Sequence, residues 1–68
     1  MKIFVNGKEV TAKEGETLQT LLKSFSIMDD DSGAAVAVNE EVIPKTNWNT
    51  YILKNENRIE IVRAVQGG

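Results

Sequence analysis

Apolar and polar residues alternate near the start of the chain in the pattern of a β-strand. Over residues 2–5 the apolar side chains are β-branched or aromatic, and period-two order places Phe4 on the opposite face from the apolar residues beside it. The pair Asn6-Gly7 follows, which is a strong signal for a two-residue hairpin turn because both positions require positive φ. Residues 8–12 then provide a returning strand. The pattern therefore predicts a β-hairpin at the start of the fold.

The apolar spacing changes to three and four residues in the next segment, which indicates a helix. Thr17 is suited to cap the first turn, since a threonine hydroxyl accepts a hydrogen bond from a backbone amide there. A single apolar stripe follows, formed by Leu18, Leu21, Leu22 and Phe25. We expect a helix of about 9 to 11 residues with this stripe buried in the core.

The second half of the chain predicts three more strands. Residues 34–38 are apolar and follow a glycine, residues 39–40 suit a turn, and residues 41–43 form a short returning strand. Pro44 ends this strand because proline has no amide to donate to a ladder. Residues 58–62 alternate strictly at first and predict a longer, half-buried last strand.

The resulting order is β-β-α-β-β-β, an α+β fold with one mixed sheet and one helix across one of its faces. The first and last strands are expected side by side and parallel in the middle of the sheet. Ile59 and Ile61 would then face the helix. The other face of the sheet would be exposed to solvent.

This exposed face carries the candidate docking residues. Phe4 and Val62 would be its large apolar side chains, and Lys2, Arg58 and Glu60 would surround them. An apolar patch with a polar rim suits a partner protein. Single surface hydrophobes are also normal in proteins without partners, so both interpretations stay open.

Two further segments have a structural and a functional interpretation. Asp29-Asp30-Asp31 lies in an expected loop over residues 26–33, and such a run could hold a hard cation. It lacks the ligand spacing and closing glutamate of a calcium loop, which favours a solvated acidic loop. Trp48 falls in a turn or 3₁₀ segment over residues 45–50, where it would either cover the core or dock a partner. The scarcity of aromatic residues favours the core.

Composition argues against several classes of function. The chain has 68 residues, no cysteine, no histidine and a net charge of −2. Ser24, Ser26 and Ser32 therefore have no histidine to activate them, and we expect neither independent catalysis nor a bound metal. The eight Lys and Arg residues are spread thinly, which argues against nucleic-acid binding. No segment has the pattern of a membrane span or a signal peptide, so we expect a cytoplasmic protein without membrane contact.

The sequence closes on Gly67-Gly68, directly after a strand-like run. Glycine reaches backbone angles that are closed to other residues and lets another backbone approach closely, so a glycine pair can enter a narrow channel in a partner. The alternative is an end without function, since chain ends are often disordered. We expect a folded domain over residues 1–66 and a flexible diglycine tail at residues 67–68.

A series of short motifs runs along the whole chain. They are Gly-Glu-Thr-Leu at residues 15–18, Val-Ala-Val-Asn at 36–39, Val-Ile-Pro-Lys at 42–45, Trp48, Ile-Glu-Ile-Val at 59–62, and Gly67-Gly68. The most specific combination is Asn39 followed by Pro44 and Trp48. In these motifs the chain resembles the ThiS-type sulfur carriers of thiamine biosynthesis, a branch of the MoaD/ThiS superfamily of ubiquitin-like β-grasp proteins.

Three positions depart from the pattern of that family. Lys45 stands where the family usually has arginine, Glu56-Asn57 where it commonly has Gly-Asp, and Gln66 where a small residue is frequent. Glutamate at a turn position of positive φ would be strained, whereas glycine would not. None of the three departures changes the glycine pair.

The resemblance implies a chemical cycle that partner enzymes perform on this protein. An E1-like adenylyltransferase of the ThiF type would join the Gly68 carboxylate to AMP, using ATP and Mg²⁺ held in its own site. A persulfide from a desulfurase system would then displace AMP and leave a thiocarboxylate, from which a ThiG-type thiazole synthase would take sulfur. Gly68 is thus the implied site of covalent modification and Gly67 its slim neighbour, with no stably bound cofactor.

Two other functions stay open at this point. The same chemistry would also serve a different sulfur acceptor, as in molybdopterin synthesis or tRNA thiolation. A β-grasp adaptor would instead bind partners through the exposed sheet face and have a chemically idle end.

Overall fold

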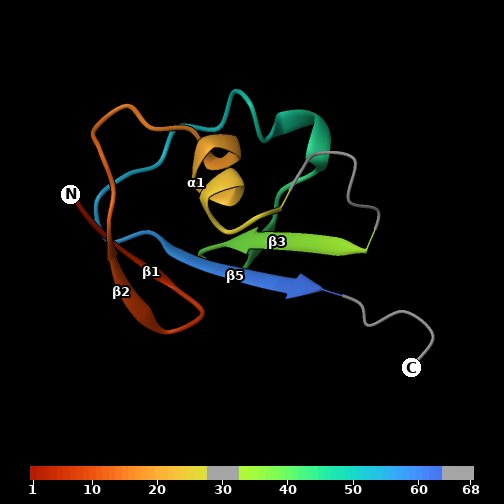
Figure 1. Cartoon of the computed structure of the whole chain (residues 1–68), viewed down its shortest axis with the longest axis horizontal. Helices are drawn as coiled ribbons and strands as arrows, with labels where there is room; N and C mark the ends of the chain where they lie inside the picture. Colours follow the sequence, from red (N-terminus) through yellow and green to blue (C-terminus); the bar gives the residue numbers. More distant parts are fainter. Residues whose placement is uncertain (28–32, 64–68) are drawn as a thin grey trace.

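In the part of the chain that the structure describes, one five-stranded sheet carries a single α-helix against one face (Figure 1). The computed structural model describes residues 1–27 and 33–63. In chain order the elements are β1 (Lys2–Val5), β2 (Lys8–Thr11), α1 (Leu18–Ser24), β3 (Ala34–Val38), β4 (Glu41–Val42), a 3₁₀ turn (Lys45–Asn47) and β5 (Arg58–Arg63). This order confirms the predicted β-β-α-β-β-β arrangement.

The strands lie in the order β2-β1-β5-β3-β4, which places the last strand in the centre. β5 is parallel to β1 and antiparallel to β3, so the sheet is mixed. The prediction that the first and last strands lie side by side and parallel is therefore confirmed. Both outer strands, β2 and β4, are short partners of hairpins.

Residues with positive φ form the turns that connect the short strands. Asn6 and Gly7 have φ values of 49° and 85°, which are the two positive angles that the predicted β1–β2 hairpin requires. Asn39 and Glu40 form the β3–β4 turn with φ values of 50° and 72°. Glu56, just before β5, has a φ of 67°, so the strain expected from glutamate at this turn is present.

The core lies between the sheet and α1, with Trp48 as its largest buried side chain. Trp48 is 1% exposed, and its Nε1–H donates a hydrogen bond of 2.9 Å to the Ile43 carbonyl. A buried tryptophan N–H usually finds such an acceptor, because leaving it without one would cost free energy. The structural interpretation of Trp48 is confirmed, and the docking alternative is wrong. The core comprises Ile3, Val5, Ala12, Leu18, Leu21, Leu22, Ile27, Ala34, Val36, Val38, Ile43, Trp48, Leu53 and Ile59.

Helix α1 begins as predicted but ends earlier. The Thr17 hydroxyl accepts a hydrogen bond of 3.2 Å from the Thr20 amide, which confirms the N-cap. The helix has seven residues, fewer than the 9 to 11 expected, and Phe25 lies beyond its end. The Phe25 side chain is 41% exposed, so its assignment to the core was wrong.

The early end of α1 results from a Schellman motif. Ser26 adopts a φ of 63°, its amide donates to Lys23 at 3.0 Å, and the Ile27 amide donates to Leu22 at 2.9 Å. Ile27 is 4% exposed and packs in the core where the apolar stripe predicted Phe25. The change of chain direction at Ser26 therefore places Ile27 in the core instead of Phe25.

Several sequence-based expectations lie outside the described residues. These are the positions of Met28, the acidic run 29–31, Ser32 and the tail 64–68. Within residues 1–27 and 33–63, no helix is long and apolar enough to span a bilayer.

The Schellman motif predicts a stabilising substitution. Ser26→Gly should raise the free energy of unfolding by about 0.5 to 1 kcal/mol, because glycine adopts positive φ without the steric cost that serine pays. Urea denaturation of both proteins measures the difference. Ser24→Gly is the matched control inside the helix, where the same change should lower stability by about 0.5 to 1 kcal/mol. Equal effects at the two positions would contradict this explanation of the helix end.

Candidate docking face and chain exit

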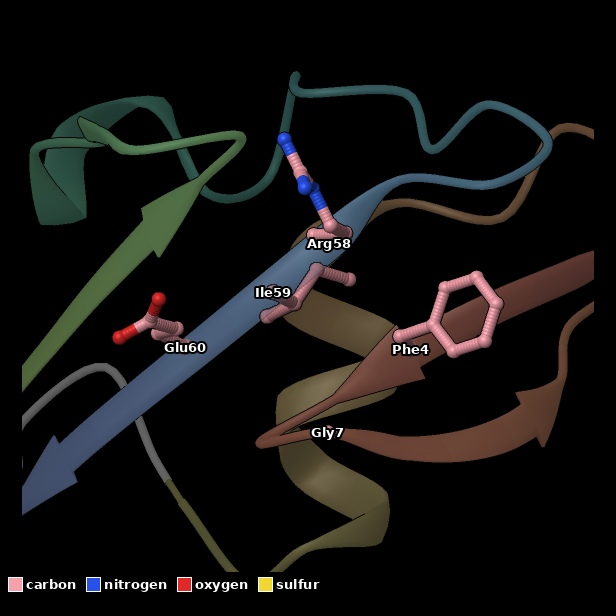
Figure 2. Close-up of a pocket in the computed structure, with 5 residues that line it drawn as sticks. All are labelled: Phe4, Gly7, Arg58, Ile59 and Glu60. Atoms are coloured by element: carbon pink, nitrogen blue, oxygen red, sulfur yellow. The ribbon is translucent and has the colours of Figure 1, made fainter.

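The uncovered face of the sheet carries the side chains that were singled out for docking. Phe4 is paired in register with Arg58, and Glu60 and Val62 follow Arg58 at period two on β5. Figure 2 shows α1 behind the strands, on the far side from these side chains. The structure therefore places all four predicted residues on the face that the helix leaves open.

Three of the four residues surround one open hollow of about 330 Å³, which we call the Phe4 hollow. Its lining consists of Phe4, Gly7, Arg58, Ile59 and Glu60. Figure 2 shows the Phe4 ring projecting from β1 and the Arg58 and Glu60 side chains diverging from β5. The hollow is therefore bounded by an aromatic ring and by charges of both signs.

Val62 lies apart from this hollow. It does not line the hollow and lies two residues beyond Glu60, about 7 Å along the strand. Val62 is 63% exposed and pairs with Ala35 on β3, and Val42, 70% exposed, pairs with Ala37 on the same strand. Cross-strand partners share a face. These four residues form a second apolar area, which we call the valine–alanine stripe.

Sequence reasoning missed Gly7 and Val42 as members of this face. Gly7 lines the Phe4 hollow, although its turn was correctly predicted. Val42 was assigned only to a short strand. Its signal was the Asn39-Glu40 turn, because a two-residue hairpin loop sets Val42 opposite Ala37 and hence on the same face.

Charged groups on this face are held loosely. The ammonium of Lys2 lies 5.6 Å from the centroid of the Phe4 ring, within range of a cation–π contact. Arg58 and Glu40 approach to 3.9 Å, but their side chains are 69% and 82% exposed. A solvent-exposed pair of this kind contributes little stability, so Arg58 can exchange Glu40 for a partner group at small cost.

β5 connects this face to the segment that carries the glycine pair. The strand ends at Arg63, and Gly67 and Gly68 lie outside the described residues. Two asparagines hold the strand from its two sides. The Oδ1 atom of Asn39 accepts from the Arg58 amide at 2.8 Å, and the Oδ1 atom of Asn6 accepts from the Ile61 amide at 2.8 Å.

The described part of the chain offers no cluster of three or more His, Cys, Asp or Glu side chains that would suit a metal ion. The acidic run at residues 29–31 falls outside that part. What the described face provides is the Phe4 hollow and the valine–alanine stripe, both built partly on the strand that leads to the glycine pair.

Comparison with known proteins decides the family. The sequence profile of the ThiS family matches residues 1–68, which includes both glycines. The chain belongs to the ThiS family. The match covers the whole chain, including every motif that carried the resemblance to this family.

Individual relatives agree with this assignment. The sulfur carrier protein ThiS of Escherichia coli (strain K12) is 26% identical over 68 residues, which cover all of both proteins. A thiazole synthase from Magnetococcus marinus contains a segment 31% identical to the whole chain, and a thiazole synthase from Paramagnetospirillum magneticum contains one that is 29% identical. The chain spans 20% of the length of each of these two synthases.

The fold is also shared with a solved structure. The crystal structure of the thiamine biosynthesis protein ThiS from Geobacter metallireducens superposes with a TM-score of 0.80, at 24% identity, over all of both chains. The predicted ubiquitin-like β-grasp fold is thereby confirmed.

Proposed function

We propose that this protein is a sulfur carrier of thiamine biosynthesis whose working group is the carboxylate of Gly68. The observation that carries the proposal is the match of the ThiS family across residues 1–68, through the glycine pair. The full-length similarity to the carrier of E. coli supports it. The fold supplies a rigid body, and β5 leads from its docking face toward the tail.

The chemistry follows from the reactivity of a carboxylate. At neutral pH this group is ionised and resists attack, so it must first be activated. One of its oxygens attacks the α-phosphate of ATP, pyrophosphate leaves, and an acyl adenylate forms. A persulfide sulfur then attacks the acyl carbon and AMP leaves. A thiol cleaves the resulting S–S bond and releases the thiocarboxylate.

Three partners are required by this cycle. An E1-like adenylyltransferase of the ThiF type supplies ATP and Mg²⁺ from its own site, and a desulfurase system supplies the persulfide. A ThiG-type thiazole synthase accepts the sulfur. Support for the synthase comes from the two thiazole synthases that contain a segment similar to this chain, since fused segments commonly act together.

We assign the docking face to the adenylyltransferase. Arg58, Glu60 and Val62 lie on β5, the strand that continues into the tail, so an enzyme that receives Gly68 approaches this face. Phe4 adds an aromatic side chain beside Arg58. Aromatic residues and arginine are the types that contribute most at protein interfaces.

The nearest alternative keeps the chemistry and changes the acceptor to molybdopterin or tRNA. The two thiazole synthase relatives favour the thiazole ring. An adaptor with a chemically idle end is the other alternative, and it predicts a protein that no adenylyltransferase modifies.

Intact-mass spectrometry tests the proposed chemistry. The protein is incubated with a ThiF-type adenylyltransferase, ATP, Mg²⁺, a persulfide donor and a reducing thiol. We expect a product in which one oxygen is replaced by sulfur, located by fragmentation at Gly68. Omitting ATP should prevent the change.

Two variants serve as controls for this experiment. Deletion of Gly68 shortens the tail, and addition of one alanine after Gly68 moves the carboxylate away from the glycine pair. Both should remain unmodified while they keep the thermal stability of the parent protein. An unchanged mass of the parent protein with an enzyme that modifies its own carrier would favour the adaptor.

Introducing a negative charge at the apolar residues of the docking face tests the assigned surface. Phe4→Asp and Val62→Asp should each weaken binding to the adenylyltransferase by about tenfold or more, because each puts a carboxylate into a buried apolar contact. Isothermal titration calorimetry measures the affinity, and circular dichroism confirms that both variants are folded.

The chain offers matched controls for these two substitutions. Phe25 is partly exposed at the end of α1, and Ile52 is 48% exposed beside Thr17, so both lie away from the uncovered sheet face. Phe25→Asp and Ile52→Asp should leave the affinity unchanged. Loss of affinity in the control variants equal to that in Phe4→Asp would refute the assignment of the surface.

A further inference from the structure

β5 extends further than its neighbour β1. β1 pairs in register only with Arg58 and Ile59, whereas β5 continues to Arg63. On its other side β5 is accompanied by β3 as far as Arg63. Figure 1 shows the end of β5 passing the β1–β2 hairpin toward the tail. The part of β5 nearest the tail therefore needs another support on the β1 side.

The side chain of Asn6 provides that support. The backbone amide of Asn6 donates to the Ile59 carbonyl at 2.9 Å, as the next residue of a parallel strand would. Its side chain then continues the ladder, because Oδ1 accepts from the Ile61 amide at 2.8 Å and Nδ2 donates to the Ile61 carbonyl at 3.4 Å. One amide side chain thus imitates one further residue of β1.

A second contact holds the strand end against the helix side. The guanidinium of Arg63 donates a hydrogen bond of 3.1 Å to the Ser26 carbonyl. Ser26 is itself fixed, because it is the positive-φ residue of the Schellman motif. A cation at the carbonyl end of a helix is also favoured by the helix dipole. The last residues of β5 are therefore held at two separate turns, by the side chain of Asn6 and by the backbone carbonyl of Ser26.

We propose that Asn6 and Arg63 are positioning residues for the tail: they fix the end of β5 at residues 61–63, the point from which the tail starts. The inference rests on the proposed function, since it concerns how the tail reaches the adenylyltransferase. A strand end that is held before binding loses less conformational freedom on binding. Neither side chain has to touch ATP or the enzyme for this effect.

The alternative interpretation is a purely structural one, in which Asn6 only stabilises the fold. Asn39 separates the two interpretations, because it is a second asparagine at positive φ that accepts from a β5 amide through Oδ1. Its partner is Arg58, at the start of the strand rather than near the tail. Glycine is tolerated at both φ values, so Asn6→Gly and Asn39→Gly remove comparable side chains from comparable turns.

The test combines enzyme kinetics with backbone dynamics. Adenylation by a ThiF-type enzyme is followed through pyrophosphate release, with the full chain as substrate. Asn6→Gly should lower kcat/KM by about threefold to tenfold, whereas Asn39→Gly should stay within about twofold of the parent. In ¹⁵N relaxation, order parameters of residues 61–63 should fall in Asn6→Gly and stay unchanged in Asn39→Gly.

Arg63 gives an independent pair of variants. Arg63→Ala removes the contact with Ser26 from an exposed position and should lower kcat/KM and the order parameters in the same direction as Asn6→Gly. Arg63→Lys keeps a cationic donor and should restore most of both. If Arg63 had only a structural role, Arg63→Ala would lower thermal stability, and Arg63→Lys would not restore kcat/KM.

The outcomes are distinct from those of the proposed function. If the parent protein is not adenylated, the proposed function fails, and the order parameters alone decide whether Asn6 and Arg63 hold the strand end. If the parent is adenylated and Asn6→Gly equals Asn39→Gly in kcat/KM and in order parameters, the positioning role is overturned.

Discussion

The structure depends on the insertion of β5 between β1 and β3. This strand is the last along the chain, yet it lies in the centre of the sheet and hydrogen bonds on both sides. Its residues alternate between two environments: Ile59 is 1% exposed against the core, whereas Arg58 and Glu60 lie on the open face. The core, the candidate docking face and the exit of the tail are thus organised by one strand.

Local chemistry explains why most of the fold was predictable. Asn6-Gly7 requires a tight hairpin, Thr17 caps a helix, and Pro44 ends a strand, each through the backbone properties of the residue itself. The end of α1 was not predictable in this way. Phe25 and Ile27 are both apolar, and the choice between them is made by a serine that adopts positive φ. Glycine at this position would have predicted a positive φ, whereas serine does not.

The candidate site was predictable in composition but not in layout. Period-two alternation placed Phe4, Arg58 and Glu60 on one face, and the structure agrees. The separation of Val62 from Phe4 depends on the register between β1 and β5, which are parallel and have no hairpin turn between them to set it. The bond between Asn6 and Ile61 joins residues 55 positions apart, so it was equally beyond reach of the sequence pattern.

The central position of β5 also has a consequence for biosynthesis. During synthesis residues 1–57 emerge before the strand that joins β1 to β3, so until then β1 and β3 have no strand between them. Contacts between such distant segments form slowly, because loop closure has to come first. The sheet therefore closes only once residues 58–63 have emerged. A partner that recognises the closed sheet thereby selects chains whose synthesis has reached the segment carrying the glycine pair.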